Sequence, residues 1–361
     1  MLRVGIVGAG RIGAKRAREV TRAPDARLVA VVDQDEQRAR ALAQSYGARA
    51  GTNWGALVTA PDIDAVVVAT THNWLAPISL AALEAHKHVL CEKPLAMTVA
   101  AAERLVAAAA RHGRKLKTGF NHRHHPALWE AHALAQAGRI GRLLWLRCRY
   151  GHGGRAGYER EWRANPAESG GGELLDQGIH ALDLFRWFLG EFSEVSAVLA
   201  RTFWPVAVED NAFCTLRTPS GQVATLHASW TQWKNLFSFE VFGEHGYLIV
   251  EGLGGNYGQE QLIIGRRPAE FGAPVEERMA FDGEDCSWAK EWEEFVSAIR
   301  EDRRPLADGF DGWQALRLVD AAYESARAGY TISVTGGGSS HGQPRIHQGI
   351  PARRQAGGRA D

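Results

Sequence analysis

The sequence is poor in cysteine and has neither a long hydrophobic run nor, before its C-terminal tail, a long block of one charge. Its four cysteines lie far apart without a C-x-x-C pair, which argues against both a zinc knuckle and a disulfide framework. The apolar N-terminus, MLRVGIVGAGRIG, is too short and too rich in glycine for a spanning helix, and it lacks the order of a signal peptide. We therefore expect a cytoplasmic protein with reduced thiols.

The charges are balanced, with 42 Lys and Arg against 41 Asp and Glu and a net charge of +1. A basic face that binds nucleic acid or a membrane surface is therefore not expected. A chain of 361 residues exceeds what one hydrophobic core usually organises, and its 45% apolar content is enough for two cores. We expect two domains.

Residues 1–120 alternate short β-branched runs with helical stretches. Runs such as RVGIVGAG, RLVAVVD, DAVVVAT and KHVLCEKP are apolar almost throughout, which is typical of parallel strands covered on both faces. The pattern predicts a doubly wound α/β Rossmann domain that binds NAD.

From about residue 143 the strands alternate polar and apolar residues and are joined by glycine-containing turns, as in FCTLRTPSGQVATLHASW. Residues 121–335 are therefore predicted to form an α+β domain for substrate binding and oligomerisation. We expect it to have a large, mostly antiparallel sheet with helices on one face, two of them near its end. Residues 336–361 contain mainly glycine, arginine and polar residues, and we expect a disordered tail.

A dinucleotide site is predicted at the end of the first strand, where a helix opens with Gly8-Ala9-Gly10-Arg11-Ile12-Gly13. The first glycine permits a tight turn, the second lets the backbone approach a pyrophosphate, and the third lets the helix pack close to the strand. The N-terminus of the helix then favours the phosphates.

The cofactor preference follows from Asp33, at the end of the next strand. Its carboxylate can accept hydrogen bonds from the adenosine ribose hydroxyls and repels a 2′-phosphate, so NAD is favoured over NADP. The alternative is that Asp33 only caps the following helix. The next three residues supply no cation for a 2′-phosphate. Arg38, slightly further along, is a cation that could bind the 2′-phosphate of NADP.

Two further strand ends carry polar residues at the carboxyl edge of the predicted sheet, where ligands of such folds bind. These residues are Thr70, Thr71, His72 and Asn73 in one strand end, and Glu92 and Lys93 in the next. Because Pro94 follows, Lys93 is biased to an extended conformation, and the bond between them can be cis. We expect all six residues to lie beside the cofactor.

Residues 170–185, GGGELLDQGIHALDLF, predict a helix with an apolar stripe and an unexpected polar face. Asp176, His180 and Asp183 follow one another by four and three residues, so an α-helix projects them from the same side. By itself, that face fits a metal site, a salt bridge or a catalytic base.

Together these pieces resemble the Gfo/Idh/MocA family of NAD(P)-dependent oxidoreductases. The matching segments, in the family's order, are GIVGAGRIG, Asp33, ATTHN, CEKPLA, GFNHRHHP and GGGELLDQGIHALDLFRWFLG. The resemblance covers about residues 1–330. The sequence departs from the family pattern where THN replaces the usual TPN and where Ala76 stands in place of a histidine.

The resemblance implies that Lys93 and His180 bracket a substrate hydroxyl above the nicotinamide, with Asp176 in the same pocket. The chemistry of alcohol oxidation agrees, because a histidine suits a general base at neutral pH and an ammonium stabilises a developing alkoxide. Asp176 either orients the imidazole or binds a neighbouring hydroxyl. Asp183, one turn further, is expected to be structural.

Four other residues are candidates for the rest of the substrate pocket. Asn121 and Arg123 should face the cleft between the domains, where Arg123 either binds a substrate anion or makes a domain-linking ion pair. Trp162 and Arg163 lie in a long glycine-containing loop of the kind that often forms a lid. No metal is expected, because Lys93 would put a competing positive charge beside Asp176.

The sequence thus predicts an NAD-dependent dehydrogenase acting on a secondary hydroxyl of a cyclic polyol, meaning a sugar, a sugar derivative or an inositol. Three alternatives stay open: a nucleotide-sugar dehydrogenase with Arg123 or Arg163 on the diphosphate, a glycosidase that holds NAD without net redox change, and a non-catalytic NAD sensor. The resemblance also implies a homodimer or homotetramer joined through the open face of the second sheet. Trp230 and Trp233 should point to opposite faces of that sheet, so at least one needs cover.

Overall fold

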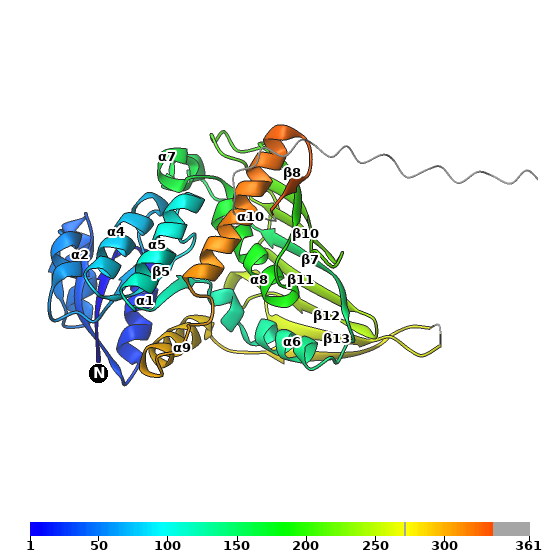
Figure 1. Cartoon of the computed structure of the whole chain (residues 1–361), viewed down its shortest axis with the longest axis horizontal. Coiled ribbons are helices and arrows are strands. Elements are labelled where there is room, and N and C mark those ends of the chain that lie inside the picture. The colour runs from blue at the N-terminus through cyan, green and yellow to red at the C-terminus, as the bar shows by residue number, and fades with distance from the viewer. Residues whose placement is uncertain (271, 335–361) are drawn as a thin grey trace, which may run out of the picture.

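The computed structural model describes residues 1–270 and 272–334, and the predicted disordered tail lies outside the described residues. Two sheets organise these residues, and helix α10 (Gly309–Ala328) stands between them (Figure 1). The first sheet is parallel and the second mostly antiparallel, which confirms the predicted fold class.

The first sheet has six parallel strands in the order β3-β2-β1-β4-β5-β6. The strands are β1 (Leu2–Val7), β2 (Ala26–Val32), β3 (Arg49–Gly51), β4 (Ala65–Val68), β5 (His88–Glu92) and β6 (Leu116–Gly119). The helices between them are α1 (Arg11–Arg22), α2 (Glu36–Ser45), α3 (Trp54–Thr59), α4 (His72–Glu84) and α5 (Val99–Arg111). The strand order reverses at β1 and β4, and such a switch point is where doubly wound sheets bind their ligands.

Helices cover both faces of this sheet, which explains why β4 is apolar at every position. Val67 packs in one cluster with side chains of α1 and α2, whereas Val66 and Val68 pack in another with side chains of α3, α4 and α5. The short β3 and α3 were not predicted.

Helix α9 (Ser287–Arg300) lies on the first sheet, although the sequence analysis placed it in the second domain. Its Trp292, Phe295 and Val296 share a hydrophobic cluster with Val4 and Ile6 of β1. An amphipathic pattern predicts that one face of a helix is buried, but it does not say which sheet buries it.

The second sheet has nine strands in the order β14-β13-β12-β11-β7-β10-β9-β8-β15, antiparallel except between β7 and β10. They are β7 (Leu143–Gly151), β8 (Glu194–Ala200), β9 (Asn211–Arg217), β10 (Val223–Ser229), β11 (Leu236–Gly243), β12 (Gly246–Glu251), β13 (Glu260–Arg266), β14 (Val275–Phe281) and β15 (Ile332–Ser333). Helices α6 (Pro126–Gln136), α8 (Ile179–Leu189) and α10 lie along one side of it (Figure 1). The helix α6 was not predicted.

Short elements connect the two halves and carry much of the candidate site. They are η1 (Asn121–His124), η2 (Tyr158–Arg160), η3 (Trp162–Ala164), α7 (Pro166–Ser169), η4 (Leu174–Gly178) and η5 (Gly255–Tyr257). The segment η4 is a π turn that leads directly into α8, so the predicted helix is not regular α-helix throughout. Such turns inside helices often occur at functional sites.

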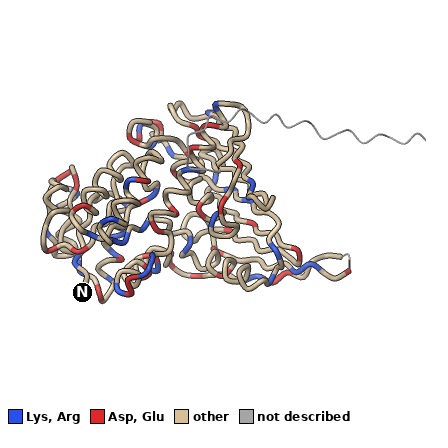
Figure 2. Tube along the Cα trace, in the orientation of Figure 1, with Lys and Arg blue, Asp and Glu red and all other residues tan. Residues whose placement is uncertain are grey.

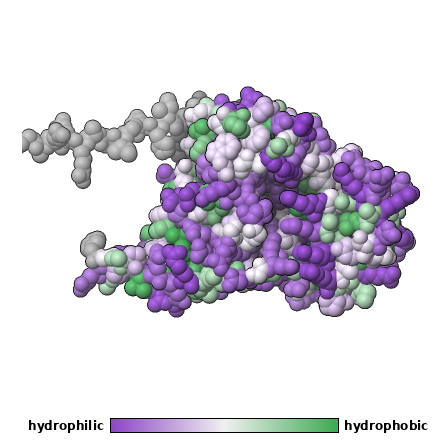
Figure 3. Space-filling view, turned by 180° about the vertical axis from the view of Figure 1, so that it is seen from behind, coloured by the Kyte–Doolittle hydropathy of each residue, from purple (hydrophilic) through white to green (hydrophobic). Residues whose placement is uncertain are grey.

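The surface of the described residues is mixed in charge and polarity. Basic and acidic residues alternate along the whole trace (Figure 2), and on the face seen in Figure 3 the hydrophobic side chains form small separate groups. Among the helices of the described residues, none is long and apolar enough to cross a membrane. Of the two tryptophans discussed above, Trp230 is fully buried and Trp233 is exposed.

Candidate active site

The glycine loop between β1 and α1 has the geometry that a pyrophosphate needs. Gly8 has a φ of +104°, and a Cβ there would lie 2.3 Å from the carbonyl oxygen of Ala69. A Cβ on Gly13 would lie 1.8 Å from the carbonyl oxygen of Gly8, whereas one on Gly10 would meet nothing within 4 Å. The outer glycines thus let the backbone pack closely, and the middle one leaves open space at the uncapped N-terminus of α1.

Asp33 is fixed beside this loop. One carboxylate oxygen accepts from the backbone N–H of Ala9 at 2.7 Å, and the other accepts from the N–H of Asp35 at 2.9 Å. Asp35, and not Asp33, caps α2. Arg38 is paired with Asp35 at 3.1 Å, so the cation that could have favoured NADP is engaged by a carboxylate, as expected of a site for NAD.

The strand end at β4 contributes a buried histidine. Thr71 donates a hydrogen bond to Asn73 at 2.6 Å, and Thr70 donates to the carbonyl oxygen of Thr71. His72 is buried, with Nδ1 2.7 Å from the carbonyl oxygen of Ser169. Burial lowers the pKa of His72 to about 4, so its imidazole is neutral and donates from Nδ1 to that carbonyl.

The end of β5 is anchored by a buried ion cluster. Arg16 of α1 donates to Glu92 at 2.7 Å and also pairs with Glu291 of α9 at 2.5 Å. The side chain of Glu92 therefore ties the strand end to α1 and, through Arg16, to α9. The peptide bond from Lys93 to Pro94 is cis.

Lys93 joins the first domain to the polar face of η4. Its ammonium donates to the backbone carbonyl of Asp176 and to Oδ1 of the same residue at 2.6 Å. Arg163 binds the other carboxylate oxygen of Asp176 at 2.8 Å. Burial raises the pKa of Asp176, but the two cations outweigh this effect and hold it well below its ordinary value. Asp176 is therefore an anion that holds Lys93 in place.

His180, on the first turn of α8, lies in the same region but makes no hydrogen bond with Asp176 among the described residues. Its ring stacks on that of His122 with the centroids 3.9 Å apart, and it meets Phe120 edge-on. Within residues 1–270 and 272–334, its Nδ1 has no hydrogen-bond partner. Burial and the charge of Lys93 lower the pKa of His180 well below its ordinary value, so the imidazole is neutral.

Arg123 is buried in a cluster of ion pairs. Its guanidinium binds Asp183 at 2.5 Å and Asp311 of α10 at 3.3 Å, and the side chain is buried. The sequence analysis gave an ion pair between the domains as the alternative role of Arg123; the observed pairs instead join three segments within residues 121–335, and they explain Asp183 as a structural acid. Asn121 is likewise buried, and its amide donates to Ser287 of α9 at 2.8 Å.

The loop before η4 covers the region beside Lys93. The guanidinium of Arg163 lies 4.5 Å from the ring centroid of Trp162, and Trp162 meets the ring of His72 edge-on at 4.7 Å. Loop and first domain thus meet through these side chains, which places Trp162 and Arg163 next to the predicted cofactor residues.

Tyr150 and Tyr257 also belong to this cluster but were not predicted as site residues. The hydroxyl of Tyr150 lies 3.1 Å from Nε2 of His122, and the hydroxyl of Tyr257 accepts from Gln177 at 3.1 Å. Tyr150 lies on the buried face of a strand whose residues alternate between buried and exposed, and Tyr257 lies in a loop. The sequence around these two tyrosines therefore does not distinguish a site residue from a core residue.

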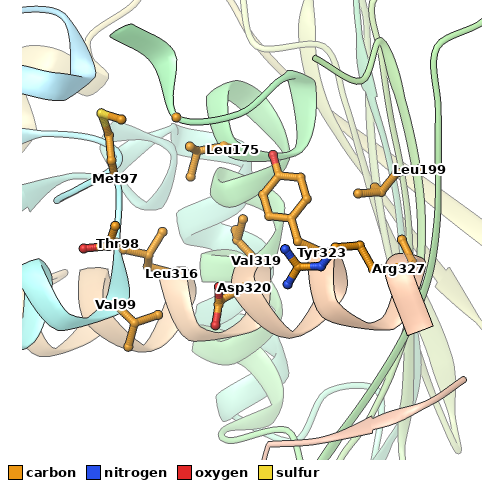
Figure 4. A pocket seen from close by; sticks show the side chains of 12 residues that line it. Met97, Thr98, Val99, Leu175, Leu199, Leu316, Val319, Asp320, Tyr323 and Arg327 are labelled. Atoms are coloured by element: carbon orange, nitrogen blue, oxygen red, sulfur yellow. The ribbon is translucent and has the colours of Figure 1, made fainter. Parts of the chain in front are cut away.

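The groove in Figure 4, of about 520 Å³, is a different feature. It is lined by Met97 and Thr98 after β5, by Leu175 of η4, and by α10 side chains including Val319 and Tyr323. None of Lys93, Asp176 and His180 lines it. Its lining is mostly apolar, with Asp320, Tyr323 and Arg327 among its polar members.

Comparison with known proteins matches both halves of the chain. A family model for the oxidoreductase family with an NAD-binding Rossmann fold covers residues 2–120, and one for the GFO/IDH/MocA C-terminal domain covers residues 128–249. The 1,5-anhydro-D-fructose reductase of Ensifer adhaerens is 30% identical over 347 residues, covering 93% of this chain and 100% of that protein. An inositol 2-dehydrogenase of Saccharopolyspora erythraea is 32% identical over 343 residues, covering 91% and 94%.

Solved structures agree with this match. A levoglucosan dehydrogenase in complex with NADH superimposes with a TM-score of 0.85 at 25% identity, over 92% of this chain and 99% of that one. An aldose-aldose oxidoreductase from Caulobacter crescentus, complexed with glycerol, gives a TM-score of 0.82 at 27% identity, over 92% and 99%.

Proposed function

The chain belongs to the Gfo/Idh/MocA family of NAD-binding oxidoreductases, and from this premise we propose that it oxidises a secondary hydroxyl of a cyclic polyol, or reduces the corresponding ketone. A sugar, a sugar derivative or an inositol is the substrate class. The observation that supports the proposal is the contact of Lys93 with Asp176, with His180 near enough for the charge of Lys93 to lower its pKa, at the end of a strand in the sheet that also carries the glycine loop.

The residues present divide the work of alcohol oxidation between them. NAD⁺ bound at the glycine loop supplies the hydride acceptor. Neutral His180 accepts the hydroxyl proton, and Lys93 donates a hydrogen bond to the oxygen and stabilises the developing alkoxide. Asp176 holds the ammonium of Lys93 at 2.6 Å, so the group is oriented before substrate enters.

The test is a substrate panel. Inositols, free sugars and nucleotide sugars are added to the protein with NAD or NADP, and absorbance at 340 nm is followed. We expect NADH formation with at least one inositol or free sugar, and faster turnover with NAD than with NADP. Absence of signal with every polyol, together with release of nitrophenol from a nitrophenyl glycoside, would instead establish a glycosidase.

The nucleotide-sugar alternative is weakened by the positions of two arginines. Both were candidates to bind the diphosphate, but Arg123 is occupied by Asp183 and Asp311, and Arg163 is bound to Asp176. A diphosphate would have to break one of these pairs.

The open face of the second sheet is proposed to join two copies of the chain. Val198 of β8 and Phe213 of β9 are exposed there, and Phe213 stacks on His227 of β10. Large apolar side chains gathered on one sheet face are typical of subunit interfaces. Light scattering should therefore give a multiple of the 39.5 kDa chain mass, and Val198→Lys with Phe213→Lys should shift it towards the monomer. A wild-type protein of monomer mass would reject this interface.

A further inference from the structure

The segment from Glu173 into α8 carries buried polar atoms that have no hydrogen-bond partner within the part of the chain that the structure describes. They are both carboxyl oxygens of Glu173, Oε1 of Gln177 and Nδ1 of His180, called the row below. Glu173 is fully buried and lies three residues before Asp176. Asp176 and Lys93 are among its charged neighbours, so the row belongs to the candidate site. Unpaired buried polar groups are costly, which indicates that the row meets a polar ligand.

The surroundings of Glu173 belong to the candidate site. Burial, and then the charge of Asp176, raise the pKa of Glu173 well above its ordinary value, against an opposing effect of Lys93. Burial raises the pKa of Tyr257 to about 12, and the charge of Glu173 adds to that rise. The indole N–H of Trp230 faces the carboxyl of Glu173 as a donor just outside normal hydrogen-bond geometry, and it opposes the rise in the pKa of Glu173.

The row selects for one kind of chemical group. Asp176 is already neutralised by Lys93 and Arg163. Glu173 holds its proton more readily than an ordinary glutamate, and in the protonated form it offers one donor and free acceptor positions. Gln177 and His180 add acceptor capacity, because the amide N–H of Gln177 already donates to Tyr257. Hydroxyl groups both donate and accept, so they can satisfy such a row, whereas phosphate and carboxylate groups only accept.

We propose that Glu173 and Gln177 are specificity-determining residues, which bind hydroxyls remote from the reacting carbon and so select an uncharged cyclic polyol over a sugar phosphate or a uronic acid. This inference rests on the proposed function, because it assigns a second part of the same substrate. Neither residue takes part in proton or hydride transfer.

The test combines variants with substrates that each lack one hydroxyl. For the best polyol of the panel, kcat/KM is measured with the parent compound and its monodeoxy series, using wild type, Glu173→Leu, Glu173→Ser and Glu173→Gln, and Gln177→Leu, which should behave as Glu173→Leu but with a different monodeoxy compound. We expect Glu173→Leu to lower kcat/KM for the parent about ten-fold, as for the loss of one buried hydrogen bond. One monodeoxy compound should escape this loss, because it lacks the hydroxyl that Glu173 binds. Glu173→Gln should restore most of the parent activity.

A matched control separates binding from folding. Glu209 is also a buried acid with a raised pKa, but its carboxylate accepts from the backbone N–H groups of Gly172 and Leu174. Glu209→Gln should therefore lower kcat/KM by the same factor for every member of the series.

Two results would overturn the inference, and they differ. If Glu173→Leu lowers kcat/KM by the same factor for every compound of the series, Glu173 is structural and the polyol activity still stands. Glu173→Ser gives the same test if the leucine variant does not fold. A wild type that oxidises no polyol would remove the proposed function itself, and the specificity assignment with it.

Discussion

Replacement of Lys93 by methionine should lower kcat for polyol oxidation about 10²- to 10⁴-fold, the range that proton handling and charge stabilisation supply in enzymes. Methionine keeps the length of the side chain but removes the ammonium that lies 2.6 Å from Asp176. The variant should fold, because Asp176 keeps its second cation, Arg163, at 2.8 Å. The affinity for NADH, measured by fluorescence titration, should change only a few-fold.

Lys115→Met is the matched control for this prediction. Lys115 precedes β6, at the opposite edge of the first sheet from Lys93, and pairs with the highly exposed Asp302 at 2.7 Å. Exposed pairs of this kind contribute little to stability, so this variant should keep wild-type kcat. A Lys93→Met protein with wild-type turnover on the panel substrate would exclude the ammonium from the mechanism.

The cofactor half of the site could be predicted because its signal is local. Gly8, Gly10 and Gly13 lie within six residues, and their roles follow from the one turn that they form. Asp33 is next along the sheet because β1 and β2 are neighbours. The signal for the fold class is equally local, because the spacing of apolar residues along a strand indicates whether one or both of its faces are buried.

The substrate half depends on contacts between distant segments, which periodicity does not encode. Arg123 and Asp183 are sixty residues apart, and only the packing of η1 against α8 turns a candidate substrate ligand into a structural ion pair. The π turn in η4 also lies outside any helical repeat. It helps to explain why Asp176 meets Lys93 while Asp183, predicted on the same face, meets Arg123.

The burial of Glu173 also depends on contacts between distant segments and could not be predicted from the sequence. By sequence it is a glutamate after three glycines at the start of a helix, where an exposed acid is common. Its burial follows from β10 and the loop that carries Tyr257, which belong to the same domain but lie far along the chain from residue 173. No local pattern in residues 170–185 indicates that.

Substitution of His180 by asparagine should lower kcat/KM about 10²- to 10⁴-fold, because the general base is lost. A second prediction concerns how kcat/KM of the wild type depends on pH. A base works when it is neutral, and burial together with Lys93 lowers the pKa of His180 well below its ordinary value of 6.5. In the oxidation direction kcat/KM should therefore stay level as the pH falls through 6.5, where an ordinary histidine would already be half protonated.

The rate of the reverse reaction should depend on pH in the opposite direction, because ketone reduction needs the protonated imidazole. Only a small fraction of His180 is protonated at neutral pH, so the rate of reduction should rise steadily as the pH is lowered through 6.5. His245→Asn provides a control, because this histidine lies in the turn between β11 and β12 and should leave both profiles unchanged. Two results would show that another group accepts the proton. One is a fall in kcat/KM for oxidation that begins at or above pH 6.5 as the pH is lowered, and the other is a pH profile that is unchanged in His180→Asn.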